Sequence, residues 1–210
     1  MTIPVYLEVG SKRVFASALD WPGWTRAGKT EADALAVLEA YAARYSPVAK
    51  KAGLALPSVK AGAFKVVERV KGNATTEFGA PAMPAKTDSE RMTNAQAERI
   101  CALLEASWKT FDAVAAKAPA SLRKGPRGGG RDRDKMVEHV LGAEAGYQRQ
   151  IGLRTRQPDL GDTKAINAFR AAILEALRGP SEGMKWPPQY MARRMAWHAL
   201  DHAWEMEDRS

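Results

Sequence analysis

The spacing of apolar residues changes from every second position to helical spacing near residue 93, and this change constrains the fold most. Apolar and polar residues alternate in 3–9 (IPVYLEV), 12–19 (KRVFASAL) and 63–70 (AFKVVERV), as in strands that bury one face. Beyond residue 93, apolar residues recur at helical spacing through most of the chain. The pattern predicts an α+β protein in which the strands precede the long helices.

Residues 1–72 are predicted to form a small ββαβ module. Gly10-Ser11 separates the first two alternating segments and predicts a two-residue hairpin turn. Thr30 is placed to cap a helix, and Gly53 suits the position just after the end of that helix. The last alternating segment supplies the third strand.

Residues 73–92 are rich in Pro, Thr, Ala and Gly and show no clear period, so they are predicted to be a linker. Residues 93–210 contain four amphipathic segments with short to moderate connections, which predicts an up-down four-helix bundle. The predicted helices cover residues 94–117, 132–151, 163–178 and 187 to about 208.

The formal net charge is +8 and the sequence pI is about 9.7. Residues 117–135 hold seven basic residues against two acidic ones, a net +5, and contain no aromatic residue. Nucleic-acid-binding proteins usually spread Lys and Arg over a face or interleave them with aromatic residues. We therefore do not expect nucleic acid to be the partner of this chain.

The basic segment includes the glycine-rich run KGPRGGGRDRDK, which leads into a predicted helix. Backbone amides at a helix N-terminus favour anions, so Arg127 and Arg131 are candidates for an anion clamp on a cofactor or substrate. The run matches neither a Walker A nor a G-x-G-x-x-G motif. The alternative is a loop whose charges are simply solvated.

Cys101 is the one cysteine of the chain, which excludes an internal disulfide framework and favours a reducing compartment. No run of about 18 apolar residues is present, and residues 1–20 alternate in polarity, unlike a signal peptide. We expect a cytoplasmic protein with no membrane-spanning helix. The apolar neighbours of Cys101 predict a small buried side chain rather than a nucleophile.

Two of the three histidines, His198 and His202, lie four residues apart in the last predicted helix. Residues at this spacing share one helix face with Cβ atoms roughly 5–6 Å apart, so both imidazoles can reach one ion. His139 lies in the second helix of the predicted bundle, among apolar neighbours. Three imidazoles with an open further position are typical of a catalytic metal site. The alternative is three hydrogen-bonded histidines at the rim of the core.

Several other residues near the histidines in the sequence each have more than one expected role. Glu205 is three residues after His202 and is expected to support that imidazole, to act as a fourth ligand, or to be exposed. Asp201 is expected to orient an imidazole or to pair with Arg194 or a lysine, since Arg194 and Asp201 fall on the polar side of the helical wheel. The tryptophans at 197 and 204 are expected to pack against the N-terminal module or a partner chain.

The histidine-containing stretches, DKMVEHVLGAEAGYQRQIG around His139 and MAWHALDHAWEMEDR around His198 and His202, resemble the DinB-like superfamily of metal-binding four-helix bundles. The resemblance covers residues 93–210. It implies that His139, His198 and His202 hold a divalent metal ion, typically zinc or nickel, at one end of the bundle. Relatives in this superfamily include transferases and isomerases that use a low-molecular-weight thiol.

The stretch FASALDWPGWTRAGKTEADAL resembles the turn and helix start of HicB-type antitoxin modules, and this resemblance covers residues 3–72. Asp20, Pro22 and Gly23 match the D-x-P-G turn, while Asp33 stands where the family usually has Glu. The resemblance implies a fold for protein association. No DNA-binding element follows it, so a toxin–antitoxin role is not expected.

Together these patterns predict a divalent-metal-dependent transferase or hydrolase that acts on a small-molecule substrate, with a low-molecular-weight thiol as a candidate co-substrate. The alternative is a non-catalytic module in which the metal stabilises the helices and the N-terminal sheet mediates association. An edge strand of that sheet makes a homodimer plausible.

Overall fold

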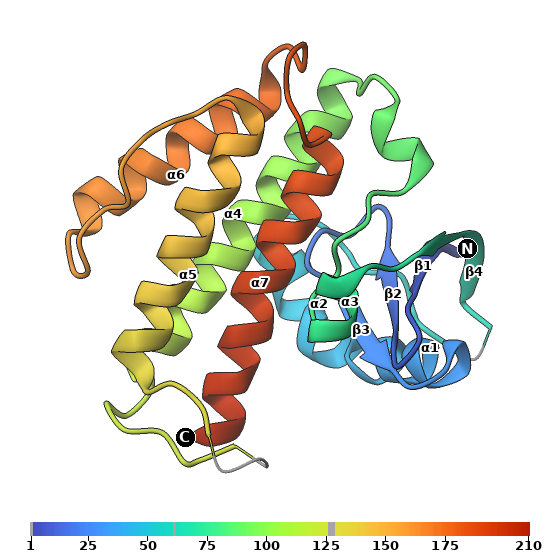
Figure 1. The fold of residues 1–210 in the computed structure, drawn as a ribbon, viewed down its shortest axis with the longest axis horizontal. Coiled ribbons are helices and arrows are strands. Elements are labelled where there is room, and N and C mark those ends of the chain that lie inside the picture. The colour runs from blue at the N-terminus through green and yellow to red at the C-terminus, as the bar shows by residue number, and fades with distance from the viewer. Residues whose placement is uncertain (1, 61, 126–128) are drawn as a thin grey trace.

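The structure is a computed structural model that describes residues 2–60, 62–125 and 129–210. A four-stranded sheet occupies the N-terminal part, and the long helices follow it, so the protein is α+β as expected. The sheet and the long helices lie side by side, with the last helix of the chain between them (Figure 1).

The four strands form one sheet in the order β3-β2-β1-β4. β1 pairs antiparallel with β2 and parallel with β4, and β3 pairs antiparallel with β2. The strands are β1 (Ile3–Val9), β2 (Val14–Ala18), β3 (Thr25–Gly28) and β4 (Phe64–Lys71). Three of them, β1, β2 and β4, are the strands that the alternating pattern predicts.

The turn between β1 and β2 lies one residue later than expected. The amide of Gly10 donates to the carbonyl of Arg13 over 2.9 Å, which leaves Ser11 and Lys12 as the two turn residues. The carboxylate of Glu77 accepts from both of their amides. A side chain distant in sequence thus binds the turn, and local turn preferences alone do not reveal its position.

The expected ββαβ order is wrong, because β3 precedes the helices. The carbonyl of Trp21 accepts from the amide of Trp24 over 3.0 Å and closes a turn that brings the chain back along β2. In β3, Thr25 Oγ1 donates to Ser17 Oγ over 3.0 Å. The sequence TRAG has no apolar alternation, so pairing with β2 rather than local pattern makes this segment a strand.

The single helix expected before Gly53 is divided into α1 (Glu31–Ala40) and α2 (Ala42–Lys51), with Tyr41 between them. Its predicted start is confirmed: the Thr30 side chain accepts from a first-turn amide, and a reciprocal bond completes a capping box. Gly53 has φ +74°, the left-handed conformation expected just beyond a helix end.

The segment 73–92, expected to lack regular structure, contains α3 (Ala74–Phe78) and the 3-10 helix η1 (Lys86–Ser89). Between them, the buried carboxylate of Glu8 in β1 accepts from the amide of Met83 over 3.1 Å. The partner that holds this segment therefore comes from β1, and composition alone does not show it.

The four long helices match their predicted ranges closely. They are α4 (Asn94–Lys117), α5 (Arg133–Tyr147), α6 (Thr163–Arg178) and α7 (Pro188–Arg209). A short 3-10 helix, η2 (Gln148–Ile151), extends α5 to the predicted end. The four helices lie next to one another (Figure 1). They share one apolar core, which includes Trp108, Met136, Phe169 and Met195.

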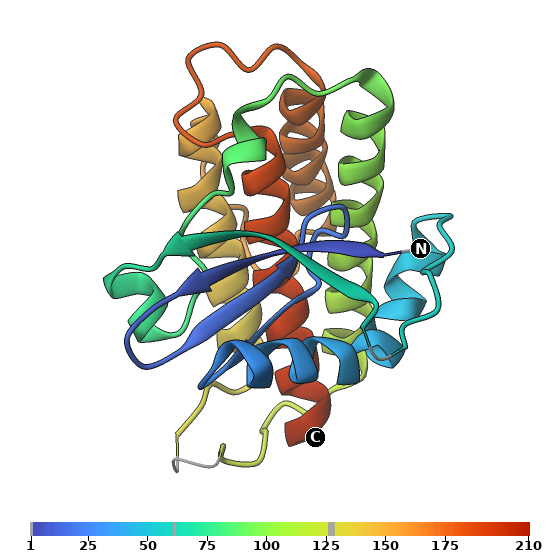
Figure 2. The ribbon, with the colours of Figure 1, turned by 90° about the vertical axis from the view of Figure 1, so that its right-hand side faces the viewer.

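The last helix, α7, is covered on two sides. Residues 190–200 are all buried, because the other long helices lie against one side and the sheet lies against the other (Figure 2). Phe15 of β2 meets Trp197 edge to face, with ring centroids 6.1 Å apart, and Tyr41 meets Trp204 at 5.2 Å. The expectation that both tryptophans pack against the N-terminal part is confirmed.

The Asp-Trp-Pro-Gly turn is fixed between α2 and α7. The hydroxyl of Tyr45 in α2 donates to the carbonyl of Pro22 over 2.8 Å. Gly23 has φ +92°, and a Cβ atom there would lie 2.6 Å from Cδ1 of Leu200. Glycine is required at this position both by the backbone conformation and by the close approach of α7.

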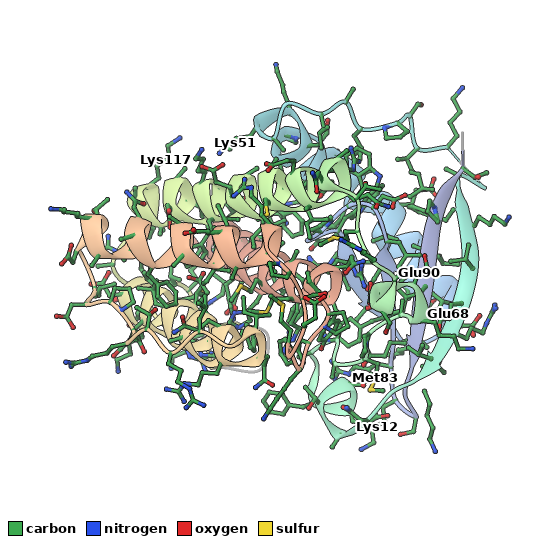
Figure 3. The ribbon with its side chains drawn as sticks, turned by 90° about the horizontal axis from the view of Figure 1, so that it is seen from above. Lys12, Lys51, Glu68, Met83, Glu90 and Lys117 are labelled. Carbon is green, nitrogen blue, oxygen red and sulfur yellow. The ribbon has the colours of Figure 1, made fainter. Side chains whose placement is uncertain are left out.

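Seen from above, Glu68 on the outer strand β4 and Lys117 at the end of α4 lie on opposite sides of the molecule (Figure 3). The sheet and the long helices thus form two layers, with α7 at their boundary. Among the described residues, no helix combines the length and the apolar character that crossing a membrane would need.

Candidate metal centre

The three histidines meet where α5 and α7 lie against each other. His139 is in the second turn of α5, and His198 and His202 occupy adjacent turns of α7. The pairs of ring centroids that involve His139 are each 5.0 Å apart, and the remaining pair is 4.7 Å apart. The apolar residues Met136 and Met195 are fully or almost fully buried beside them, so the core packing of both helices positions the imidazoles.

One nitrogen from each histidine lies within 4.8 Å of a nitrogen of each of the others. Nε2 of His139 and Nε2 of His198 are 3.2 Å apart. Imidazole nitrogens bound at 2.0–2.1 Å to a tetrahedral ion would be about 3.4 Å apart. The donor set and its spacing therefore fit one divalent ion such as zinc, with at least one position left for another ligand.

The surroundings keep two of these imidazoles neutral. The pKa of His139 is lowered to about 4, mainly by burial, with smaller contributions from the nearby charges of His202 and Arg131. Burial also lowers the pKa of His198 well below its ordinary value, with contributions from His202 and Arg194. A neutral imidazole is the form that binds a metal ion, so the environment favours the ligand form at neutral pH.

Glu205 lies beside His202 and accepts from Arg209. Its Oε2 is 3.0 Å from Nδ1 of His202, and its Oε1 accepts from Nη1 of Arg209 over 2.7 Å. The hydrogen bond with His202 is the main cause that lowers the pKa of Glu205. With Nδ1 bound to the carboxylate, Nε2 of His202 is the nitrogen available to an ion. Of the alternatives for Glu205, the geometry favours support of His202.

Asp201 does not orient an imidazole. It forms an ion pair with Arg26 of β3, and the guanidinium of Arg26 lies 4.2 Å from the ring centroid of Tyr41. The prediction that Asp201 pairs with Arg194 or a lysine was wrong, because its partner comes from a strand that the sequence pattern does not reveal. Asp201 therefore links the sheet to α7.

The predicted anion clamp is described only in part. Arg127 lies outside the described residues. Arg131 is exposed, and its carbonyl accepts from Nη1 of Arg209 over 2.9 Å. Its positive charge contributes to the lowered pKa of both His139 and His198. Arg131 is therefore near the centre, and the clamp stays a prediction.

Two residues near the centre were not foreseen. The ring centroid of Tyr147 lies 5.9 Å from that of His198, and the guanidinium of Arg194 lies 5.1 Å from the Tyr147 ring. Arg194 is only 8% exposed, whereas the helical wheel put it on the polar side. Its position one turn before His198 was a signal that it shares the histidine face.

Cys101 is fully buried in α4, as expected. Its Sγ lies 3.6 Å from the carbonyl of Leu174, and burial raises the pKa of its thiol to about 11. It therefore does not contribute a thiolate to the centre at neutral pH.

Comparison with known proteins identifies no relative, because no family model, no curated protein and no solved structure matches this chain. Any assignment of the histidine centre must therefore come from its own geometry.

Proposed function

We propose that this protein binds one divalent metal ion, zinc or nickel, through His139, His198 and His202. The observation that carries the proposal is the meeting of all three histidines of the chain, from two helices, with nitrogens within 4.8 Å of one another. The lowered pKa of two of them and the carboxylate beside the third also support it. Such partners set the orientation of ligands in metal sites.

We propose further that the protein is an enzyme of the DinB-like type, a transferase or hydrolase of a small molecule that uses a low-molecular-weight thiol or water. A bound divalent ion would supply Lewis-acid chemistry that lowers the pKa of that thiol or water. His202 is held by Glu205, and the half-buried His139 leaves the centre accessible to a ligand. The shared core of α4, α5, α6 and α7 is consistent with a four-helix bundle.

Each residue of the histidine centre has its own role in this proposal. The neutral imidazoles of His139 and His198 would each supply a lone pair to the ion. Glu205 would accept a hydrogen bond from Nδ1 of His202 and fix which nitrogen faces the centre, and Arg209 holds Glu205 in place. The core of the long helices limits how much water reaches the histidine cluster.

The second candidate is an association role for the HicB-like N-terminal module. β3 and β4 are the two edges of the sheet, and Val67 of β4 is 46% exposed. An exposed edge strand can pair with a second copy of the chain. Light scattering across a concentration series would measure this association, and a monomer at all concentrations would contradict it.

Elemental analysis of untagged protein tests the metal proposal. We expect about one divalent ion per chain in the wild type and loss of that ion in His139→Ala, His198→Ala and His202→Ala. Glu207→Gln, an exposed position on the same helix, is the matched control and should keep the ion. A wild-type protein that stays metal-free after incubation with zinc and nickel would refute the proposal.

A further inference from the structure

Arg194 is a buried cation for which the described residues provide no carboxylate. It is 8% exposed, its Nη1 has no hydrogen-bond partner, and no acidic group described here lies within ion-pair distance of it. The other buried arginines of the long helices differ. Arg193 pairs with Asp88, and Arg170 pairs with Glu144. A buried charge normally requires such a partner.

Two aromatic rings hold Arg194 in place. Its guanidinium carbon lies 5.1 Å from the ring centroid of Tyr147 and 4.8 Å from that of Trp197. Ring faces stabilise a cation, but they leave its N–H groups without acceptors. Arg194 is therefore a positioned guanidinium with unused donor capacity.

The buried polar atoms without hydrogen-bond partners lie close to the histidine centre. Arg194 precedes His198 by one helical turn, and the Trp197 and His198 ring centroids are 6.0 Å apart. Trp197 Nε1 and His198 Nδ1 are also buried without a partner among the described residues. Three unsatisfied polar groups within two turns of one helix are unusual in a folded protein, and a ligand would satisfy them.

We propose that Arg194 binds the carboxylate of a small-molecule ligand whose thiol or oxygen reaches the centre formed by His139, His198 and His202. This inference rests on the proposed metal function and specifies its substrate class: a compound that carries a carboxylate about one helical turn from a metal-binding group. The planar fork of an arginine matches a carboxylate through two parallel hydrogen bonds.

The surrounding charges favour a group with a single negative charge. Glu8 is fully buried on the facing strand, near enough for the charge of Arg194 to act on its carboxyl. Its oxygens already accept from Thr76 and from the amides of Ala82 and Met83, and no hydrogen bond joins Glu8 to Arg194 among the described residues. A dianion such as a phosphate monoester would meet more repulsion from a charged Glu8 than a singly charged carboxylate, which Arg194 can hold through two parallel hydrogen bonds.

The test compares two thiols on cobalt-loaded protein, with the thiolate-to-cobalt absorption band as readout. One is 3-mercaptopropionate, which carries a carboxylate, and the other is the neutral 2-mercaptoethanol. We expect the wild type to bind 3-mercaptopropionate roughly 10- to 100-fold more tightly, the range for one charged hydrogen-bonded contact. Arg194→Gln should reduce this preference to about twofold and leave the affinity for 2-mercaptoethanol unchanged.

Arg99→Gln is the matched control, because Arg99 also stacks on a tryptophan, with its guanidinium 4.3 Å from the Trp21 ring, but far along the chain from the histidines. It should keep the wild-type preference. Circular dichroism checks that the variants are folded. If Arg194→Gln does not fold, equal affinity of the wild type for the two thiols would still overturn the proposal.

The outcomes separate the two proposals. If cobalt does not bind, or binds equally to His198→Ala, the metal function itself fails. If cobalt binds but the wild type shows equal affinity for the two thiols, or no thiolate band with either, the assignment of Arg194 alone is overturned. It is also overturned if Arg131→Gln abolishes the preference and Arg194→Gln retains it, because the carboxylate would then lie on the glycine-rich loop.

Discussion

Glu205 tests the histidine centre without removing any of its nitrogens. Its Oε2 lies 3.0 Å from Nδ1 of His202, and Arg209 donates to its other oxygen over 2.7 Å. Glu205→Gln keeps an oxygen in this place but removes the charge, whereas Glu205→Ala removes both. The two variants should therefore weaken metal binding to different degrees, while the ligand set stays complete.

The expected magnitude follows from the environment of the carboxylate. A hydrogen bond to a charged group contributes about 1.5–3 kcal/mol, and the side chain of Glu205 is 35% exposed, so solvent reduces this contribution. We expect about tenfold weaker zinc binding for Glu205→Gln and up to about 100-fold for Glu205→Ala, in the range seen for outer partners of metal ligands. The corresponding free energies are about 1.4 and 2.7 kcal/mol.

The assay is competition for zinc with a chromophoric chelator at neutral pH. Glu207→Gln is the control, because Glu207 lies on the same helix, is 45% exposed and pairs with Arg44 at 2.7 Å, away from the histidines. It should bind zinc within about twofold of the wild type. If Glu205→Ala also binds like the wild type while His202→Ala loses zinc, then Glu205 does not orient His202, and the reasoning about its role is wrong.

Three further predictions concern the fold. Glu144→Ala should lower the free energy of unfolding, measured by urea denaturation, by about 3 kcal/mol, because Arg170, which is 5% exposed, then keeps only the exposed Asp112 as a partner. A loss below about 1 kcal/mol would show that the buried pair is not needed. Gly23→Ala should lower the free energy of unfolding by about 2–4 kcal/mol, since it adds left-handed backbone strain to a clash with α7. Gly53→Ala, with a similar φ and open space around it, should lower it by only about 1 kcal/mol. Equal losses for the two variants would contradict the close approach of α7 to Gly23. Burial raises the pKa of Cys101 to about 11, so its thiol should react with iodoacetamide at pH 8 at least about 100-fold more slowly in the native than in the unfolded protein. The reaction rate of the native protein should rise with pH. Rapid labelling of the native protein would show that the thiol is accessible.

The long helices could be predicted from the sequence because their signals are local. The ends of α4 and α6 coincide with their predicted ranges, since helical spacing and end signals are read within a few residues. The same holds for β1, β2 and β4, where apolar alternation marks the strands. By contrast, β3 and the divided helix after it were missed, because pairing with β2 and packing against α7 determine them.

In the candidate site, too, local features could be predicted from the sequence and contacts between distant segments could not. The spacing of His198 and His202 places both on one face of a helix, and this followed from the sequence. That Nε2 of His139 lies 3.2 Å from Nε2 of His198 depends on how α5 packs against α7, and the sequence supported it only through the predicted bundle and a family resemblance. The partner of Asp201 could not be predicted, because Arg26 lies on the unpredicted strand.

The sequence alone was enough to predict the four long helices and to place the three histidines in two of them. What surrounds those helices depends on how the sheet and the other helices pack against them. On a helical wheel Arg194 belongs to the polar side of α7, since a wheel assigns one face to the core and the other to water. In the folded protein the sheet covers that second face, so Arg194 is 8% exposed and lies between the rings of Tyr147 and Trp197. The spacing of apolar residues predicts which side chains of a helix are buried only when one layer of the protein covers the helix, whereas α7 is packed between two layers.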